Sequence, residues 1–329
     1  MIVVTGGAGF IGSALVWGLN KRGREDILVV DVLNKEDNDS REKNLSNLKF
    51  KDFMDKDKFL ESLEAWGSWE IEGILHMGAI SSTTESNIRL LLRNNYEYTK
   101  SLAIWCMRNR VRFVYASTAA TYGDGSYGFS DEETLLPFLK PLNNYGYSKH
   151  LFDLWALRSG ALEKITGLKY FNVFGPNEYH KKEMRSVVYK AFEQIRKEGK
   201  VSLFKSYNPN FRDGEQMRDF IYIKDAVDIT LFIYEMKKAT GIFNVGTGKA
   251  RSFHDLAMAV FEAMGKNPEI EYIEMPESIK EKYQYFTRAE IGKLKRLGYR
   301  KKLYSLEEGI KEYVQEYLLS ENKYLQVSK

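Results

Sequence analysis

The first twelve residues, MIVVTGGAGFIG (residues 1–12), decide the fold. Their apolar run, Ile2–Val4, predicts a buried strand, and the helical spacing of Leu15 and Leu19 predicts a helix directly after the glycine-rich turn. In a dinucleotide-binding fold such glycines allow a sharp turn, a close approach of backbone to a pyrophosphate, and tight packing of helix on strand. The N-terminus of the helix then offers unpaired N–H groups to the phosphates.

Asp31 extends this pattern. It closes a second apolar run, residues 27–30, at the distance from the glycines expected of an acidic residue that binds a ribose. The sequence therefore predicts a bound nicotinamide dinucleotide. The charged loop 34–44 is interpreted either as a solvated connection or as a source of cations for a 2′-phosphate. On the second interpretation, Arg41 in the loop and Lys56 further along the chain are the candidates. Asp31 itself favours NAD; we expect NADP, with NAD as the alternative.

Composition limits the class of protein. The 329 residues are 43% hydrophobic, which is enough for a large core. A formal net charge of +4, with both signs spread along the chain, gives no reason to expect nucleic acid and suits an anionic small substrate. Cys106 is the only cysteine, so no disulfide framework is predicted. No signal peptide or membrane-length apolar stretch is found in the sequence, and we expect a cytoplasmic protein without a membrane partner or a metal site.

A set of catalytic side chains is predicted at the end of one strand and at the start of the helix that follows it. Residues 111–116 predict a strand that leads into Thr118, and a long helix is expected from Tyr145 to near Thr166. Tyr145 and Lys149 lie four residues apart and so share one helical face. An ammonium group beside a phenol lowers the pKa of the phenol towards that of a general base. Together with a strand-end hydroxyl in a dinucleotide fold, this pair predicts catalysis.

Further strands and helices are predicted without a catalytic role. Residues 71–79 predict another strand, and the next helix carries Asn94 and Asn95, interpreted either as surface asparagines or as groups near the nicotinamide. Asp225 is expected to cap the helix that follows a strand at residues 220–223. The chain is expected to finish in an amphipathic helix, residues 305–319, with a polar, frayed tail from residue 320.

Several short motifs along the chain together indicate a resemblance to a known family. They are residues 78–85 (GAISSTTE), 119–123 (AATYG), 170–176 (YFNVFGP), 180–181 (HK), 218–220 (RDF), 243–248 (FNVGTG) and 283–287 (YQYFT). With the glycine turn, Thr118 and the Tyr145/Lys149 pair, the chain resembles the extended short-chain dehydrogenase/reductases that act on nucleotide sugars. Within these it resembles the ADP-heptose 6-epimerases over nearly its whole length.

The resemblance implies an α/β fold: a Rossmann-type, doubly wound parallel sheet in residues 1–171 plus about 219–248. It also implies a smaller C-terminal α/β substrate lobe in residues 172–218 plus about 249–329. The implied activity is inversion of C6 of an ADP-heptose through a transient ketone, in heptose precursor synthesis for lipopolysaccharide. Tyr145 and Lys181 are the implied acid/base groups, Lys149 contacts the cofactor ribose and Tyr145, and Thr118 contacts the substrate. We also expect a homo-oligomer.

The implied contacts form two sets. The cofactor set is Gly6, Gly9, Phe10, Ile11, Gly12, Asp31, Val32, Arg41, Lys56, Met77, Gly78, Ala79, Ile80, Ser81, Asn94, Lys149, Val173 and His180. The substrate set is Thr118, Asn172, Glu183, Lys190, Phe204, Lys205, Ser206, Tyr207, Arg218 and Tyr283. Val32 stands where the family usually has asparagine, and Glu183 and Lys190 stand where it usually has serine and histidine. The segment 206–217 is longer than usual.

Other activities remain as alternatives. Another sugar epimerase would use the same groups. A sugar 4,6-dehydratase needs carboxylic acid/base groups beside the strand-end hydroxyl, where this chain has Ala119 and Ala120, which cannot transfer a proton. A cofactor-binding protein without activity would have no use for Thr118, Tyr145 and Lys149 together. The sequence therefore favours the epimerase.

Overall fold

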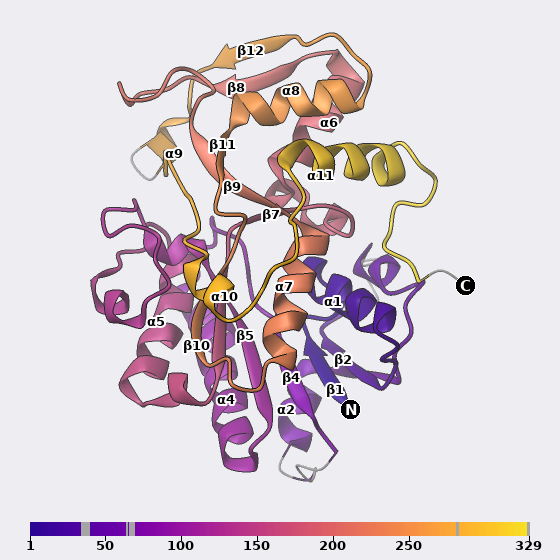
Figure 1. Ribbon diagram of the computed structural model, residues 1–329, viewed down its shortest axis with the longest axis vertical. Helices are drawn as coiled ribbons and strands as arrows, with labels where there is room; N and C mark the ends of the chain where they lie inside the picture. The colour runs from indigo at the N-terminus through magenta and orange to yellow at the C-terminus, as the bar shows by residue number, and fades with distance from the viewer. Residues whose placement is uncertain (34–39, 64, 66–69, 281–282, 328–329) are drawn as a thin grey trace.

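The computed structural model describes residues 1–33, 40–63, 65, 70–280 and 283–327 (Figure 1). Seven strands form the main sheet, and every pairing in it is parallel. In spatial order the strands are β10 (Gly241–Val245), β6 (Thr166–Tyr170), β5 (Arg112–Thr118), β4 (Gly73–His76), β1 (Ile2–Thr5), β2 (Ile27–Asp31) and β3 (Asp52–Asp55). The order reverses between β1 and β4, which is where open α/β sheets bind their ligands. The predicted Rossmann-type fold is confirmed.

Both faces of this sheet are buried because neighbouring residues of each strand point to opposite sides. In β1, Ile2 and Val4 belong to the same apolar cluster as Leu15, whereas Val3 belongs to the cluster that contains Leu102. Figure 1 shows the helices on either side of the strands. They are α1 (Phe10–Lys21) and α7 (Ile223–Glu235) in the first cluster, and α2 (Lys56–Ser62), α4 (Tyr98–Asn109) and α5 (Asn144–Arg158) in the second, with α3 (Ile88–Leu91) leading towards α4.

The smaller part of the molecule lies at the upper end in Figure 1. One small sheet joins β11 (Ala250–Ser252), β9 (Met217–Tyr222) and β7 (Asn172–Phe174), and another pairs β12 (Ile270–Ile273) with β8 (Val201–Phe204). Its helices are α6 (Val187–Glu198), α8 (Phe253–Ala263), α9 (Glu277–Lys280) and α11 (Leu306–Glu312). Helix α10 (Gly292–Arg296) instead lies beside β10 of the main sheet. Because β7 follows β6 after a single residue, this part begins at the carboxyl edge of the main sheet.

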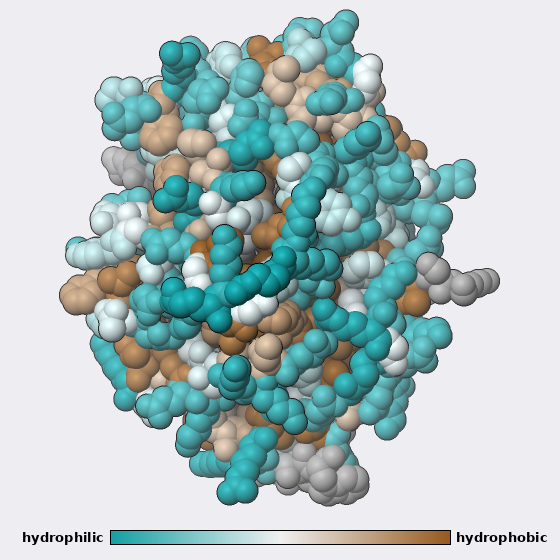
Figure 2. Space-filling view, viewed as in Figure 1, coloured by the Kyte–Doolittle hydropathy of each residue, from teal (hydrophilic) through white to brown (hydrophobic). Residues whose placement is uncertain are grey.

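The face shown in Figure 2 is largely hydrophilic, and its long polar side chains lie over α10, which carries Lys293, Lys295 and Arg296. Within the described ranges, the helices are too short or too polar to cross a bilayer.

Three local predictions are wrong. Helix α5 ends at Arg158 rather than near Thr166, because the chain turns through Gly160, whose φ is +70°, and Thr166 begins β6. Asp225 does not cap α7: Tyr222 is the capping residue, and Oδ2 of Asp225 accepts from the Tyr304 amide at 2.7 Å. The C-terminal tail is not frayed up to residue 327, since Leu325 is only 1% exposed.

Candidate active site

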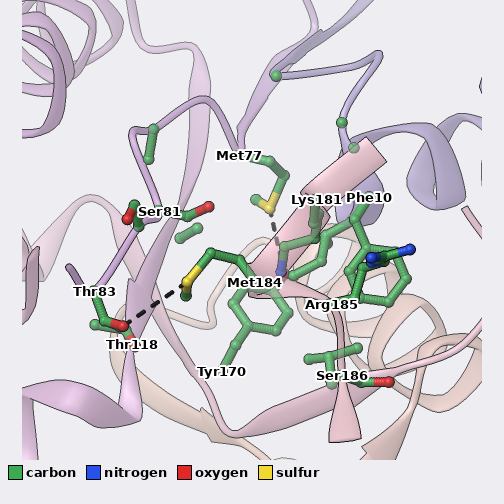
Figure 3. A pocket seen from close by; sticks show the side chains of 18 of the residues that line it. Phe10, Met77, Ser81, Thr83, Thr118, Tyr170, Lys181, Met184, Arg185 and Ser186 are labelled. Carbon is green, nitrogen blue, oxygen red and sulfur yellow. Dashed lines mark hydrogen bonds between the residues drawn. The ribbon is translucent and has the colours of Figure 1, made fainter. Parts of the chain in front are cut away.

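A cavity of about 690 Å³ opens at the carboxyl ends of β1, β4, β5 and β6 (Figure 3). These strands lead into Gly6, Met77, Thr118 and Phe171 respectively, all of which line it. From the cofactor set, the lining includes Gly6, Gly9, Phe10, Ile11, Gly12, Asp31, Arg41, Met77, Gly78, Ala79, Ile80, Ser81, Lys149, Val173 and His180. The proposed catalytic residues Thr118, Tyr145 and Lys181 line the same space, as does Asn172.

The glycine turn has no room for side chains. Gly6 has a φ of +63°, and a Cβ atom there would lie 2.6 Å from the Gly78 amide nitrogen. A Cβ atom on Gly12 would lie 2.0 Å from the Gly6 carbonyl oxygen. Since Gly9 precedes the first turn of α1, bare backbone and a helix N-terminus meet at the cavity wall. This arrangement suits a pyrophosphate.

Asp31 lies beside a cation. Its Oδ2 accepts from the Ala8 amide at 3.0 Å, its Oδ1 accepts from the Val32 amide at 2.7 Å, and Arg41 pairs with Oδ1 at 3.1 Å. Lys56 lies elsewhere: its Nζ donates to Oδ1 of Asn94 at 2.8 Å, and neither residue is among those that line the described cavity. Residues 34–39 of the charged loop lie outside the described residues.

Thr118, Tyr145 and Lys149 come from the end of β5 and the first two turns of α5. The helix begins at Asn144, where Oδ1 of the capping residue Asn143 accepts from the Gly146 amide at 2.8 Å. Lys149 is 2% exposed, and its Nζ has no hydrogen-bond partner among the described residues. Burial lowers the pKa of Lys149 to about 8, against the opposing charge of Asp153.

The pKa of Tyr145 differs from the predicted direction. Burial raises the pKa of this phenol above its usual value, and a hydrogen bond with Thr118 opposes the change. The expectation of a lowered pKa considered only the neighbouring ammonium. Removal of the phenol from water has the larger effect.

A buried charged network supports the end of β5. Lys169 and Asp153 form an ion pair at 3.1 Å with side chains 1% and 0% exposed. Oδ2 of Asp153 accepts from Ser117 at 2.7 Å, and Lys169 donates to Oγ1 of Thr121. Thr121 in turn donates to the Thr118 carbonyl oxygen at 2.8 Å. The backbone beneath the proposed catalytic hydroxyl is therefore fixed by a network that crosses two strands and a helix.

Lys181 reaches the cavity from the segment 177–184, here called the lysine loop. Its Nζ lies 5.4 Å from the centre of the Phe10 ring, and the two side chains lie together in Figure 3. Burial lowers the pKa of Lys181, and the charge of Glu178 opposes this. Glu178 is itself buried and accepts from the Gly175 amide at 3.3 Å and from the Ser186 hydroxyl at 2.7 Å, which anchors the loop at both ends.

Residues 2–246 match the NAD dependent epimerase/dehydratase family. The chain belongs to this family. A relative from Nitratidesulfovibrio vulgaris, named ADP-L-glycero-D-manno-heptose-6-epimerase, is 51% identical over 99% of this chain and 100% of its own length. The predicted resemblance to these epimerases is confirmed.

Two solved structures of epimerases have the same fold as this chain. The ADP-L-glycero-D-manno-heptose-6-epimerase of Helicobacter pylori is 29% identical, with a TM-score of 0.78 over 96% of this chain and 95% of its own. The UDP-glucose 4-epimerase of Thermus thermophilus, solved with NAD, is 27% identical, with a TM-score of 0.72 over 95% of this chain and 97% of its own.

The rest of the predicted substrate set lies outside the cavity lining described above. Arg218 is 8% exposed, and its guanidinium carbon lies 5.3 Å from the Tyr283 ring centre, with Phe204 edge-on to that tyrosine at 6.5 Å. These three form a separate aromatic and cationic cluster. Glu183, Lys190, Lys205, Ser206 and Tyr207 are exposed or half-buried. Tyr207 donates to Glu274, to which Lys205 is also paired.

Some cavity-lining residues were not predicted, and Asn95, interpreted either as a surface asparagine or as a group near the nicotinamide, is not at the surface. Tyr170, Met184 and Arg185 line the cavity (Figure 3). Asn95 is fully buried in a π-helical segment, where it accepts from the Ile80 amide at 2.9 Å and donates to the Ser148 hydroxyl at 3.0 Å. The asparagine pair in an amphipathic helix was a usable signal for this residue. The position of Tyr170 on β6 gave none.

Proposed function

We propose that this chain inverts C6 of an ADP-heptose by transient oxidation to a ketone, in the supply of heptose for lipopolysaccharide. The observation that carries the proposal is that Thr118, Tyr145, Lys149 and Lys181 line one cavity beside a glycine turn. The name of the 51% identical relative supports the choice of sugar and of carbon. We further propose that residues 1–171 plus about 219–248 hold the cofactor and the remainder holds the sugar nucleotide.

The residues present fit a nicotinamide dinucleotide. The turn from Gly6 to Gly12 leaves backbone open to a pyrophosphate. The buried ammonium of Lys149, which has no hydrogen-bond partner in the part of the chain that the structure describes, is suited to donate to ribose hydroxyls. When bound, the nicotinamide accepts a hydride from the sugar carbon and returns it to the opposite face. Arg41, at the cavity wall beside Asp31, supports NADP through its charge.

The cofactor is identified by denaturing the purified protein and weighing the released nucleotide. We expect NADP. Release of NAD alone would contradict the role given to Arg41 and would leave Asp31 as the ribose contact.

Tyr145 and Lys181 are proposed to exchange the hydroxyl proton, one for each epimer. They reach the cavity from α5 and from the lysine loop, so neither has to move when the sugar presents its other face. Thr118, at the end of β5, orients the reacting hydroxyl. Water elimination is disfavoured because Ala119 and Ala120 follow Thr118 and neither can act as an acid or a base.

Solvent isotope incorporation tests the route. C6 of the heptose is a carbinol carbon with no neighbouring carbonyl, so its hydrogen is not acidic and the two bases cannot remove it directly. Epimerisation in deuterated water should therefore place no deuterium at C6 and should need no added oxidant. Substantial deuterium at C6 would point to a deprotonation route and would overturn the proposal.

The substrate contacts are proposed from both parts of the molecule. Asn172 lines the cavity, whereas Arg218 lies between the rings of Phe253 and Tyr283 and is suited to a phosphate or an adenine. A homo-oligomer is also proposed.

A further inference from the structure

The C-terminal tail, residues 320–327, returns to the side of α1 (Figure 1). Leu325 is 1% exposed and belongs to the apolar cluster that also contains Leu15. Nε1 of Trp17 on α1 donates to the Gln326 carbonyl oxygen at 3.1 Å. The tail is therefore packed against the dinucleotide-binding side of the molecule.

The tail also contacts the lysine loop directly. The Tyr179 hydroxyl donates to the Lys323 carbonyl oxygen at 2.5 Å, and its ring lies edge-on to Tyr324 at 5.3 Å. The Leu325 amide donates to Oδ1 of Asn177 at 3.0 Å. These contacts lie two and four residues before Lys181.

Asn177 joins the tail to the cavity wall. It is fully buried and has a φ of +78°, a conformation that costs a non-glycine residue about 1 kcal/mol or more. Its Nδ2 donates to the Ser13 hydroxyl at 2.9 Å, and its carbonyl accepts from Asn44 at 3.2 Å. Ser13 lies in the first turn of α1, and its hydroxyl donates to the carbonyl oxygen of Phe10, whose ring lies beside Lys181.

We propose that the C-terminal tail is a positioning element that holds the lysine loop, and with it Lys181, against Phe10 at the cavity wall. Its catalytic consequence rests on the proposed function, whereas its structural consequence does not. Without the tail, the Tyr179 hydroxyl and Oδ1 of Asn177 lose the partners described above, and the left-handed backbone at Asn177 loses one of its supports. Lys181 then leaves its half-buried place and becomes hydrated.

The test compares two truncated chains with the full protein, each with its bound nucleotide. One chain ends at Asn322 and lacks these contacts; the matched control ends at Val327 and keeps them. Lysines are acetylated at a series of pH values and quantified by mass spectrometry, with the exposed neighbour Lys182 as internal reference. The pH midpoint of Lys181 labelling is expected to rise in the shorter chain only, because burial lowers the pKa of Lys181 and loss of the tail would expose it.

Turnover is measured on the same samples. A displaced acid/base group should lower kcat about 10²-fold with a smaller change in KM. If the shorter chain does not fold, Leu325→Ala is used in its place. This variant should raise the pH midpoint of Lys181 labelling and lower kcat, as expected for the shorter chain. An unchanged Lys181 midpoint, with or without loss of nucleotide, would overturn the positioning role. A shifted midpoint in a protein whose full chain has no epimerase activity would instead refute the proposed function alone.

Discussion

Replacement of Lys149 by methionine should stabilise the cofactor-free protein near neutral pH. The ammonium is buried without a hydrogen-bond partner among the described residues, and its pKa falls from 10.5 to about 8. At about 1.4 kcal/mol for each pKa unit, keeping this group charged destabilises the folded state by about 3–4 kcal/mol. With about 2.1 cal/mol/K of unfolding entropy per residue over the chain, removal of that cost should raise Tm by about 4–6 °C.

The pH dependence has a definite sign. Below about pH 8 the lysine is charged in both states and the difference in stability between variant and wild type is constant. Between about pH 8 and 10.5 the unfolded chain binds the proton that the folded protein has released, so the wild type gains stability as pH rises. Above 10.5 the advantage of Lys149→Met should disappear.

Thermal unfolding followed by circular dichroism at pH 7, 9 and 10.5 measures this difference. Lys164→Met is the control, since Lys164 is exposed and its replacement should change Tm little at any pH. Added nucleotide should stabilise the wild type more than Lys149→Met, because the variant lacks the ammonium proposed to contact the ribose. A Lys149→Met protein that is no more stable than the wild type at pH 7 would refute the inference that the ammonium is held at a cost.

Two further predictions concern the network and the acid/base pair. Tyr145→Phe and Lys181→Met should each lower kcat by about 10²–10⁴-fold while nucleotide remains bound. The control Lys182→Met, at an exposed lysine, should have nearly normal kcat. Near-normal turnover of Lys181→Met would show that Lys181 takes no part in catalysis. Asp153→Asn leaves the charge of Lys169 buried without its partner and should cost about 3–5 kcal/mol, or about 4–7 °C in Tm. Adding Lys169→Met should restore much of the loss, and a double variant as unstable as the single one would contradict this account.

What the sequence predicts well is local. The glycine turn, the strands around it and the i, i+4 pair Tyr145/Lys149 depend on residues close together in the chain, and their placement follows from period and spacing. The end of α5 is not predicted, because a single glycine, Gly160, stops the helix and one glycine is a weak signal. With the apolar pattern continuing beyond it, Thr166 looked helical although it pairs in a central strand.

The rest depends on long-range contacts. Lys169 and Asp153 come from a strand and a helix, and each alone resembles an ordinary surface charge in the sequence. The tail contains Leu325 among polar residues, so its composition favours solvent, and its place is visible only through contacts with distant residues such as Trp17, Asn177 and Tyr179. Contacts across more than a hundred residues leave no periodic signal in a single sequence.

The seven-stranded sheet is completed only late in the synthesis of the chain. Strand β6 ends at Tyr170, but its outer neighbour β10 begins only at Gly241, after part of the smaller sheets has been made. At about 5–20 residues per second, a ribosome needs about 4–14 s to add the roughly 70 residues between them. Throughout that interval β6 is the edge of a growing sheet with unpaired backbone groups, the kind of surface on which nascent chains aggregate. We therefore expect the nascent chain to be most exposed to aggregation while β7, β8 and β9 are being translated.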